Sequence, residues 1–172
     1  METEGSIYYD EQRLSKLWFI ISIGIGCFIL FFILKDVYNG IGNIWVLLTI
    51  TLIFILYTAF DAFLFLYLKL TVKVDYEFIH IKLFPFASKK IPISEIFLTE
   101  ATVFRPIKDY GGYGIRVIFN KKESAYFLSG NTGVRVYYAI SNPVVIGTSE
   151  PKKLINAIVY AQQRKKILSE MN

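Results

Sequence analysis

Two long apolar runs lie close together near the start of this 172-residue chain, at residues 17–34 and 44–68. Each run is long enough to cross a bilayer core of about 30 Å as a helix, which takes roughly 20 residues. The residues between them are polar and include two glycines, so they allow only a tight reversal. The sequence therefore predicts a transmembrane helical hairpin that leaves residues 1–16 and 69–172 on one side of the membrane.

The distribution of charge indicates which side that is. Residues 1–68 carry 3 basic and 6 acidic side chains, whereas residues 69–172 carry 16 and 8. Basic residues flank the outer ends of both apolar runs, and cytoplasmic loops of membrane proteins are enriched in such residues. We expect a multi-pass protein of the cytoplasmic membrane with both termini in the cytoplasm. The alternative is a translocated domain, because long domains can cross a membrane whatever their charge.

Three residues within the hairpin are candidates for contacts inside the membrane. Ser22 and Gly26 are four residues apart, a spacing that lets two helices approach closely in lipid. Asp61 is the only ionisable residue within either apolar run. An intramembrane carboxylate suggests a functional site, but a partner-pairing group near the cytoplasmic edge, or an assembly contact with another membrane protein, is the favoured interpretation.

The pattern changes to alternation from residue 69 onward. Leu70, Val72 and Val74 share one face of a predicted strand, and further short apolar runs follow with turn residues between them. About seven strands with no helix between them favour antiparallel pairing. An amphipathic helix over residues 149–168 closes the chain, with Leu154, Ile155, Ile158 and Val159 on its apolar face. The prediction is an α+β membrane protein whose soluble domain, residues 69–172, is a small antiparallel β-barrel capped by this helix.

Two segments add a resemblance to a known family. Gly-Tyr-Gly-Ile-Arg at residues 112–116 and Ile-Gly-Thr-Ser-Glu-Pro at residues 146–151 are the most specific parts of a similarity that covers most of residues 44–160. In these segments the chain resembles bacterial membrane-anchored proteins with a pleckstrin-homology-like (PH-like) domain, in which a two-span hairpin precedes the barrel. The resemblance implies a PH-like fold and a place in the bacterial inner membrane, and it brings no activity with it.

Residues suited to catalysis are scarce. The chain has one histidine, His80, and one cysteine, Cys27, which lies in the first apolar run. Arrangements that join a nucleophile to a histidine base would all depend on His80. The spacing of acidic, histidine and cysteine residues does not match a metal site. We therefore expect no enzyme activity, no cofactor and no metal, and no recognition motif indicates binding to nucleic acid.

An aromatic and glycine-rich segment is the best binding candidate, because it offers stacking rings and charged hydrogen-bond donors beside a flexible backbone. Its candidate residues are Arg105, Tyr110, Gly112, Tyr113, Gly114 and Arg116. The alternative is a barrel corner that needs glycine for steric reasons, with Arg116 paired to Asp109 or Glu100.

A set of lysines could meet anionic lipid, since each cation near an acidic leaflet contributes about 1 kcal/mol. The candidates are Lys69, Lys73, Lys89 and Lys90. An ordinary solvated strand face is the favoured explanation for most of them.

The function expected from the sequence is that of a non-catalytic, membrane-tethered PH-like scaffold or interaction module. Its barrel would bind another membrane protein or its own copy at the cytoplasmic face, with membrane lipids as further partners. Two alternatives remain open: an anionic-lipid-binding membrane organiser, and an accessory subunit of a membrane transporter or enzyme complex that docks through the hairpin.

Overall fold

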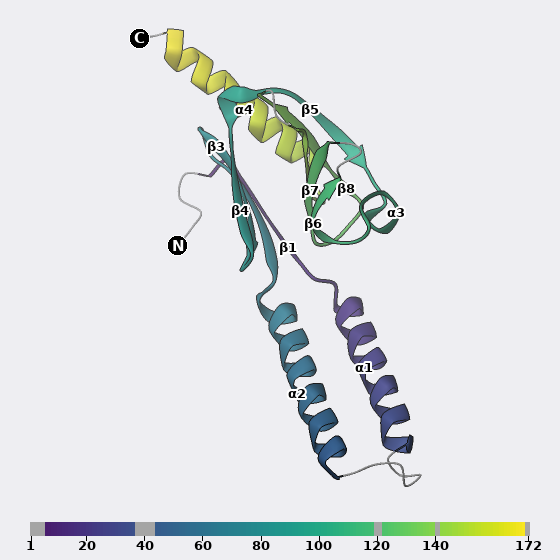
Figure 1. Ribbon diagram of the computed structural model, residues 1–172. Coiled ribbons are helices and arrows are strands. Elements are labelled where there is room, and N and C mark those ends of the chain that lie inside the picture. Colours follow the sequence, from purple (N-terminus) through teal and green to yellow (C-terminus); the bar gives the residue numbers. More distant parts are fainter. Residues whose placement is uncertain (1–5, 37–43, 119–121, 140–141, 171–172) are drawn as a thin grey trace. The chain divides into compact units, whose positions relative to one another are not determined.

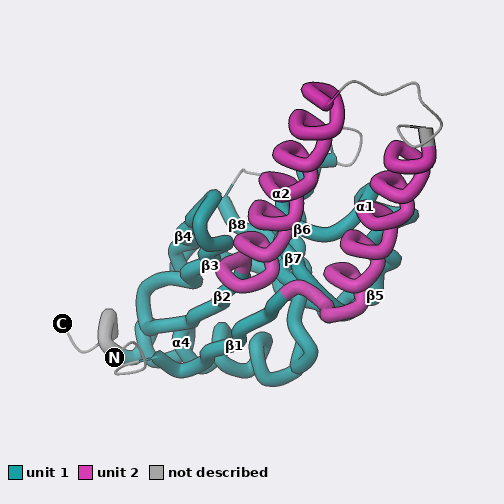
Figure 2. Tube along the Cα trace, turned by 90° about the horizontal axis from the view of Figure 1, so that it is seen from below, with its two compact units in different colours: residues 1–13, 69–172 teal, residues 14–68 magenta. Residues whose placement is uncertain are grey.

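The chain folds into two compact units, which Figure 2 distinguishes by colour. The computed structural model describes residues 6–36, 44–118, 122–139 and 142–170. One unit is Leu14–Leu68, and the other combines Met1–Arg13 with Lys69–Asn172. The predicted α+β class is confirmed, because two long apolar helices and two β-sheets make up these units (Figure 1).

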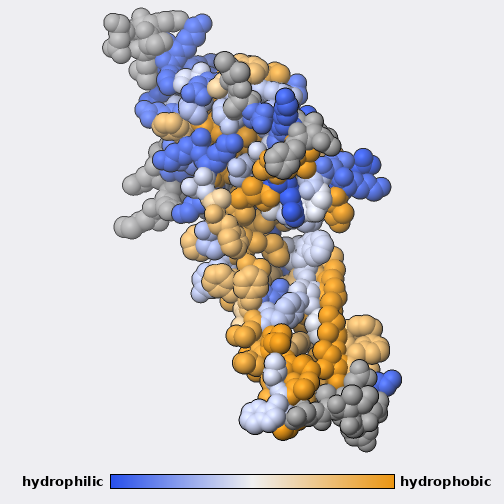
Figure 3. Space-filling view, in the orientation of Figure 1, coloured by the Kyte–Doolittle hydropathy of each residue, from blue (hydrophilic) through white to orange (hydrophobic). Residues whose placement is uncertain are grey.

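The first unit consists of α1 (Lys16–Asp36) and α2 (Ile44–Tyr67). Both helices are long and apolar enough to cross a membrane, judged by length and composition. Almost none of their residues are buried in the protein, and Figure 3 shows mostly hydrophobic residues on the visible face of this unit. A core helix of a soluble protein would bury such residues, so these helices present an apolar surface to their surroundings.

The first sheet has four antiparallel strands in the order β1-β2-β3-β4. Its strands are β1 (Tyr8–Arg13), β2 (Lys69–Val74), β3 (Phe78–Phe84) and β4 (Ala87–Pro92). Alternate residues of β2 and β3 are buried, as the period of two in the sequence predicts. Leu70, Val72 and Val74 lie on the buried face, as expected.

Strand β1 was missing from the sequence-based description, which placed residues 1–16 in a segment outside the soluble domain. In the structure, β1 pairs along its whole length with β2, and Arg13 is the register partner of Lys69. In the sequence, both apolar helices therefore lie between two strands that pair with each other in one sheet. The chain leaves this sheet after Arg13 and returns to the same end of it at Lys69.

The second sheet has five strands in the order β5-β8-β9-β7-β6. A short 3₁₀ helix, η2 (Ile93–Glu95), leads into it. Its strands are β5 (Ile96–Val103), β6 (Gly114–Ile118), β7 (Glu123–Phe127), β8 (Thr132–Tyr138) and β9 (Val144–Gly147), and the short helix α3 (Pro106–Tyr110) lies between β5 and β6.

Two features of these sheets correct the predicted antiparallel barrel. The described strands number nine and form two open sheets, with no closed barrel among them. Strand β9 pairs antiparallel with β8 but parallel with β7. The physical reason is that β9 inserts between β7 and β8, which are consecutive in the sequence but, with β9 between them, do not pair with each other. Such non-local pairing leaves no trace in local alternation.

The C-terminal helix α4 (Pro151–Glu170) packs on β5, β8, η2, β1 and β2. Its buried side chains are Leu154, Ala157, Ile158 and Ala161. The predicted apolar face is thus correct for Leu154 and Ile158, whereas Ile155 is half-buried and Val159 is exposed. The buried face of α4 includes the alanines Ala157 and Ala161. It is therefore rotated about the helix axis relative to the face predicted from the large apolar residues.

Candidate binding surface

Strand β5 forms one edge of the five-stranded sheet and carries exposed apolar side chains. Within the described part of the chain it pairs with β8 alone. Phe97 is 69% exposed and Val103 is 75% exposed. At the start of the strand, the side-chain amide of Gln162 in α4 donates to the Ile96 carbonyl at 2.7 Å. The remaining edge leaves every second backbone N–H and C=O directed outward, which is the geometry that accepts an added strand.

A groove of about 440 Å³ continues from the end of β5. It is lined by Phe104, Arg105, Pro106, Ile107, Lys108, Tyr113 and Asn131. Its lining is mainly aromatic and aliphatic, while Arg105 and Lys108 supply positive charge at its margin. An apolar groove with a few polar groups is the usual form of a site for a side chain or small ligand. Arg105 and Tyr113, two of the predicted binding residues, meet in this groove.

The short helix α3 holds the groove in shape. Pro106 occupies its first turn, where a missing N–H costs nothing. The Asp109 carboxylate accepts the backbone N–H of Arg105 at 2.8 Å and lies 3.5 Å from the Arg105 guanidinium. Gly111 ends the helix at a φ of 72°, a conformation that favours glycine. These contacts fix the backbone of Arg105 while leaving most of its side chain exposed.

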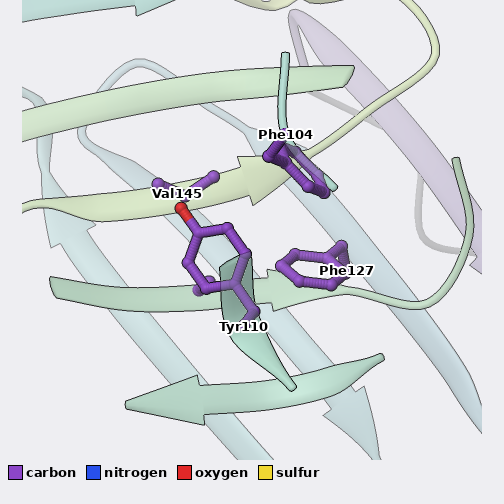
Figure 4. Packing of buried hydrophobic residues seen from close by; sticks show 5 residues of the cluster. Phe104, Tyr110, Phe127 and Val145 are labelled. Atoms are coloured by element: carbon purple, nitrogen blue, oxygen red, sulfur yellow. The ribbon is translucent and has the colours of Figure 1, made fainter. Parts of the chain in front are cut away.

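Tyr110 was predicted to bind a partner, but the structure places it in the core. Its ring packs edge-on against Phe104 and Phe127 (Figure 4). The ring centroids are 5.6 and 5.2 Å away, respectively. Its hydroxyl donates to the buried Glu123 carboxylate at 2.9 Å, and the other oxygen of Glu123 lies 3.2 Å from Arg135 Nε. Tyr110 therefore supports the groove from beneath.

The other predicted residues of this segment form a local turn instead of lining the groove. Gly112 and Gly114 have φ angles of 129° and 106°, and the Arg116 Nε donates to the Gly112 carbonyl at 3.3 Å. The glycines thus serve the backbone bend that leads into β6. The pairing of Arg116 with Asp109 or Glu100, considered from the sequence, is replaced by this contact with the backbone.

The predicted lipid-facing lysines do not share one surface. Lys73 pairs in register with His80, and His80 pairs with Lys90, so these side chains share the outer face of the four-stranded sheet. The exposed Lys82, one strand repeat from His80, extends this positive face. Lys89 points to the opposite face, where its Nζ lies 5.6 Å from the centre of the Tyr138 ring. Alternation along β4 separates Lys89 from Lys90.

The predicted intramembrane residues make contacts within the hairpin itself. The Ser22 and Tyr57 hydroxyls lie 2.6 Å apart, and the Tyr57 hydroxyl also donates to the Ser22 carbonyl at 3.0 Å. Gly26 is buried against the Tyr57 ring. Asp61 has one carboxylate oxygen that is buried with no hydrogen-bond partner among the described residues. The face of α1 that carries Ser22 and Gly26 therefore packs against α2. Of the three predicted residues, only Asp61 remains a candidate for contact with another protein.

The free edge of β5 is the part of this surface that sequence reasoning missed. Phe97 and Val103 resembled ordinary strand residues, and their exposure depends on the sheet order, which the sequence does not reveal. Across residues 6–36, 44–118, 122–139 and 142–170, no group of three His, Cys, Asp or Glu side chains is placed to hold a metal ion. No protein-family model, curated protein or solved structure matches the chain.

Proposed function

We propose that this chain is a non-catalytic, membrane-anchored interaction module that binds an extended segment of a partner protein along β5. The observation that carries the proposal is the open edge of β5, with Phe97 and Val103 exposed, running into the apolar groove at Arg105. An added strand would gain backbone hydrogen bonds from the edge. The groove would select among side chains of that strand. In strand-addition complexes, backbone hydrogen bonds usually supply affinity and side-chain pockets supply specificity.

Membrane anchoring by α1 and α2 is part of the same proposal. It is supported by the length of both helices, their apolar composition and the near absence of buried residues in them. Both helices are connected to the same end of the β1–β2 pair, at Arg13 and Lys69. This connection also supports a hairpin whose two ends lie on one side of the membrane. The charge distribution favours the cytoplasmic side.

The PH-like character of the soluble unit is likewise proposed. The support is a sheet of four successive antiparallel strands, a second sheet of five strands, and one C-terminal helix that packs on strands of both. The parallel pairing of β7 with β9 departs from the expected antiparallel barrel. A PH-like unit with an open β5 edge offers a site for peptides without requiring catalytic residues.

Site-specific photo-crosslinking in intact membranes tests the binding surface. A photoreactive residue in place of Val103 should form an adduct with a second protein. The same residue in place of Val117 on the opposite edge strand, β6, is a matched control because Val117 is also exposed. Phe97→Lys should abolish the adduct at position 103, because it puts a charge on the proposed apolar contact. Equal adducts at both positions would contradict a β5 site, and an adduct only with a second copy would assign the edge to self-assembly.

Labelling with a membrane-impermeant thiol reagent tests the anchoring. In a Cys27→Ser background, Asn39→Cys should react from outside intact cells, whereas Ser6→Cys should react only after the membrane is opened. Reaction of Ser6→Cys from outside, with Asn39→Cys protected, would indicate a translocated domain, and reaction of both from outside would contradict a membrane-spanning hairpin.

A further inference from the structure

The turn between β3 and β4 carries two exposed phenylalanines. Phe84 ends β3 and is 40% exposed, and Phe86, in the two-residue turn, is 62% exposed. The Phe86 N–H donates to the Leu83 carbonyl at 2.8 Å and closes the turn. Because Leu83 is buried while both rings point outward, the rings add little to the core of the domain. Two large aromatic rings at one hairpin tip form a patch that suits an external apolar partner.

The strand register places this turn at a particular end of the sheet. Phe84 is the register partner of Lys69, and Lys69 is the partner of Arg13. Arg13 and Lys69 are the residues at which the chain leaves for α1 and returns from α2. The aromatic turn therefore lies at the tethered end of the four-stranded sheet, the end from which both apolar helices are connected.

Positive charge surrounds the aromatic turn. Lys82 is exposed, and its Nζ lies 5.9 Å from the centre of the Phe84 ring. Arg13 and Lys69 add two cations at the same end of the sheet, where both pair with one carboxylate, Glu11, at 2.8 and 3.6 Å. Three cations face one acid, so this end of the sheet keeps a positive excess that complements an anionic surface.

We propose that Phe84 and Phe86 insert into the interfacial layer of the bilayer, with Lys82 and Lys69 contacting anionic phospholipid headgroups. Aromatic rings prefer the headgroup level, and juxtamembrane cations are attracted to acidic leaflets. The occupant is lipid because the aromatic pair, the positive charge and the tether to the apolar helices occur together. The proposal rests on the membrane anchoring proposed above and is independent of binding at β5. It gives the soluble unit a second attachment to the bilayer, which would limit its rotation about the two connections to the helices.

An environment-sensitive fluorophore in proteoliposomes of the full chain tests this insertion. In a Cys27→Ser background, a nitrobenzoxadiazole probe is attached to Phe86→Cys, or to Val117→Cys as a control of similar exposure, 55%. The probe at position 86 should show blue-shifted emission and quenching by nitroxide-labelled lipids, whereas the probe at position 117 should emit as in water. Co-flotation of each variant with the liposomes reports anchoring separately. Water-like emission at position 86 from protein that floats would overturn the insertion while leaving the anchor intact. Failure to float would overturn both.

Lipid composition tests the role of charge. The blue shift at position 86 should be larger in vesicles of phosphatidylcholine with phosphatidylglycerol than in vesicles of phosphatidylcholine alone, and Lys82→Glu should remove that difference. A shift that is equal in both vesicles would overturn the contact with anionic headgroups. Probe fluorescence in the Phe84→Ser variant provides a second check, because insertion through both rings predicts a smaller shift there, and an unchanged shift contradicts the role of Phe84.

Discussion

The side-chain amide of Gln12 donates to the backbone carbonyl of Gly147 at 2.6 Å and so joins the two sheets. Its oxygen accepts the backbone N–H groups of Leu128 and Ser129 at 3.1 and 3.3 Å. Gln12 belongs to β1, the strand just before the first apolar helix. The segment that precedes the hairpin is thus fastened to both sheets of the soluble unit, and its removal would open a sheet edge as well as a buried polar site.

Gln12→Ala should destabilise the soluble unit by about 1–3 kcal/mol, because it leaves buried backbone groups without partners. The free energy of unfolding of the detergent-solubilised full chain, measured by denaturant titration, checks this value. Tyr9→Phe on the same strand is the control, since Tyr9 is exposed and surface changes usually stay within about 0.5 kcal/mol. Equal effects of both substitutions would contradict the bridging role of Gln12.

Much of the local structure could be predicted from the sequence, because it depends on local pattern. The apolar runs at 17–34 and 44–68 correspond to α1 and α2, with ends that differ by at most two residues. The alternation at Leu70, Val72 and Val74 correctly identified a buried strand face. These features follow from the period of side-chain burial within a single element.

The parts that escaped prediction depend on contacts between distant segments. Strand β1 reads Tyr-Tyr-Asp-Glu-Gln-Arg, a polar sequence with no apolar alternation, and its partner β2 follows only after both apolar helices. The burial of Tyr110 and Glu123 depends on their mutual hydrogen bond across two elements. Two residues of the groove, Arg105 and Tyr113, could be predicted because aromatic and charged residues lie close together in the sequence there. The open edge of β5 could not be predicted, because it depends on the order of strands in the sheet.

Two buried tyrosines should make the fold sensitive to alkaline pH. Burial raises the pKa of Tyr8 to about 12 despite its hydrogen bond with Thr148. Burial, reinforced by the Glu123 carboxylate, likewise raises the pKa of Tyr110 to about 12. Unfolded tyrosine ionises near pH 10. The stability from these groups is therefore complete below about pH 10 and is lost as the pH rises through 12.

Denaturant titrations across this alkaline range check the expectation. Tyr110→Phe should start from a lower stability at neutral pH but lose less of it between pH 10 and 12, since one titrating group is gone. A slope equal to that of the parent protein would contradict the role of Tyr110.

Asp75 should contribute to stability against acid. Burial by itself would raise the pKa of this carboxyl, but the N–H groups of Phe78 and Glu77 and the His80 ring together hold it below its ordinary value. Its Oδ2 lies 2.7 Å from His80 Nε2. The stability is present above the unfolded pKa near 4 and is lost as the pH falls through the lower folded value. Asp75→Asn should therefore flatten the fall of unfolding free energy in acid titrations, and an unchanged fall would contradict this assignment.

The hairpin offers a matched pair of glycines that separates helix packing from a general effect of bulk. A Cβ at Gly26 would lie 2.9 Å from the Tyr57 ring, whereas a Cβ at Gly24 would meet nothing within 4 Å. Gly26→Leu should push α2 away and break the contact between the Tyr57 and Ser22 hydroxyls, which contributes about 0.6 to 2 kcal/mol in membrane helices. Gly24→Leu adds the same volume on an open face. Thermal loss of helicity, followed by circular dichroism in detergent, should shift to lower temperature only for Gly26→Leu, because only Gly26 faces the Tyr57 ring of α2. Equal shifts for both variants would indicate a general effect of bulk and would contradict a specific role of Gly26 in packing α1 against α2.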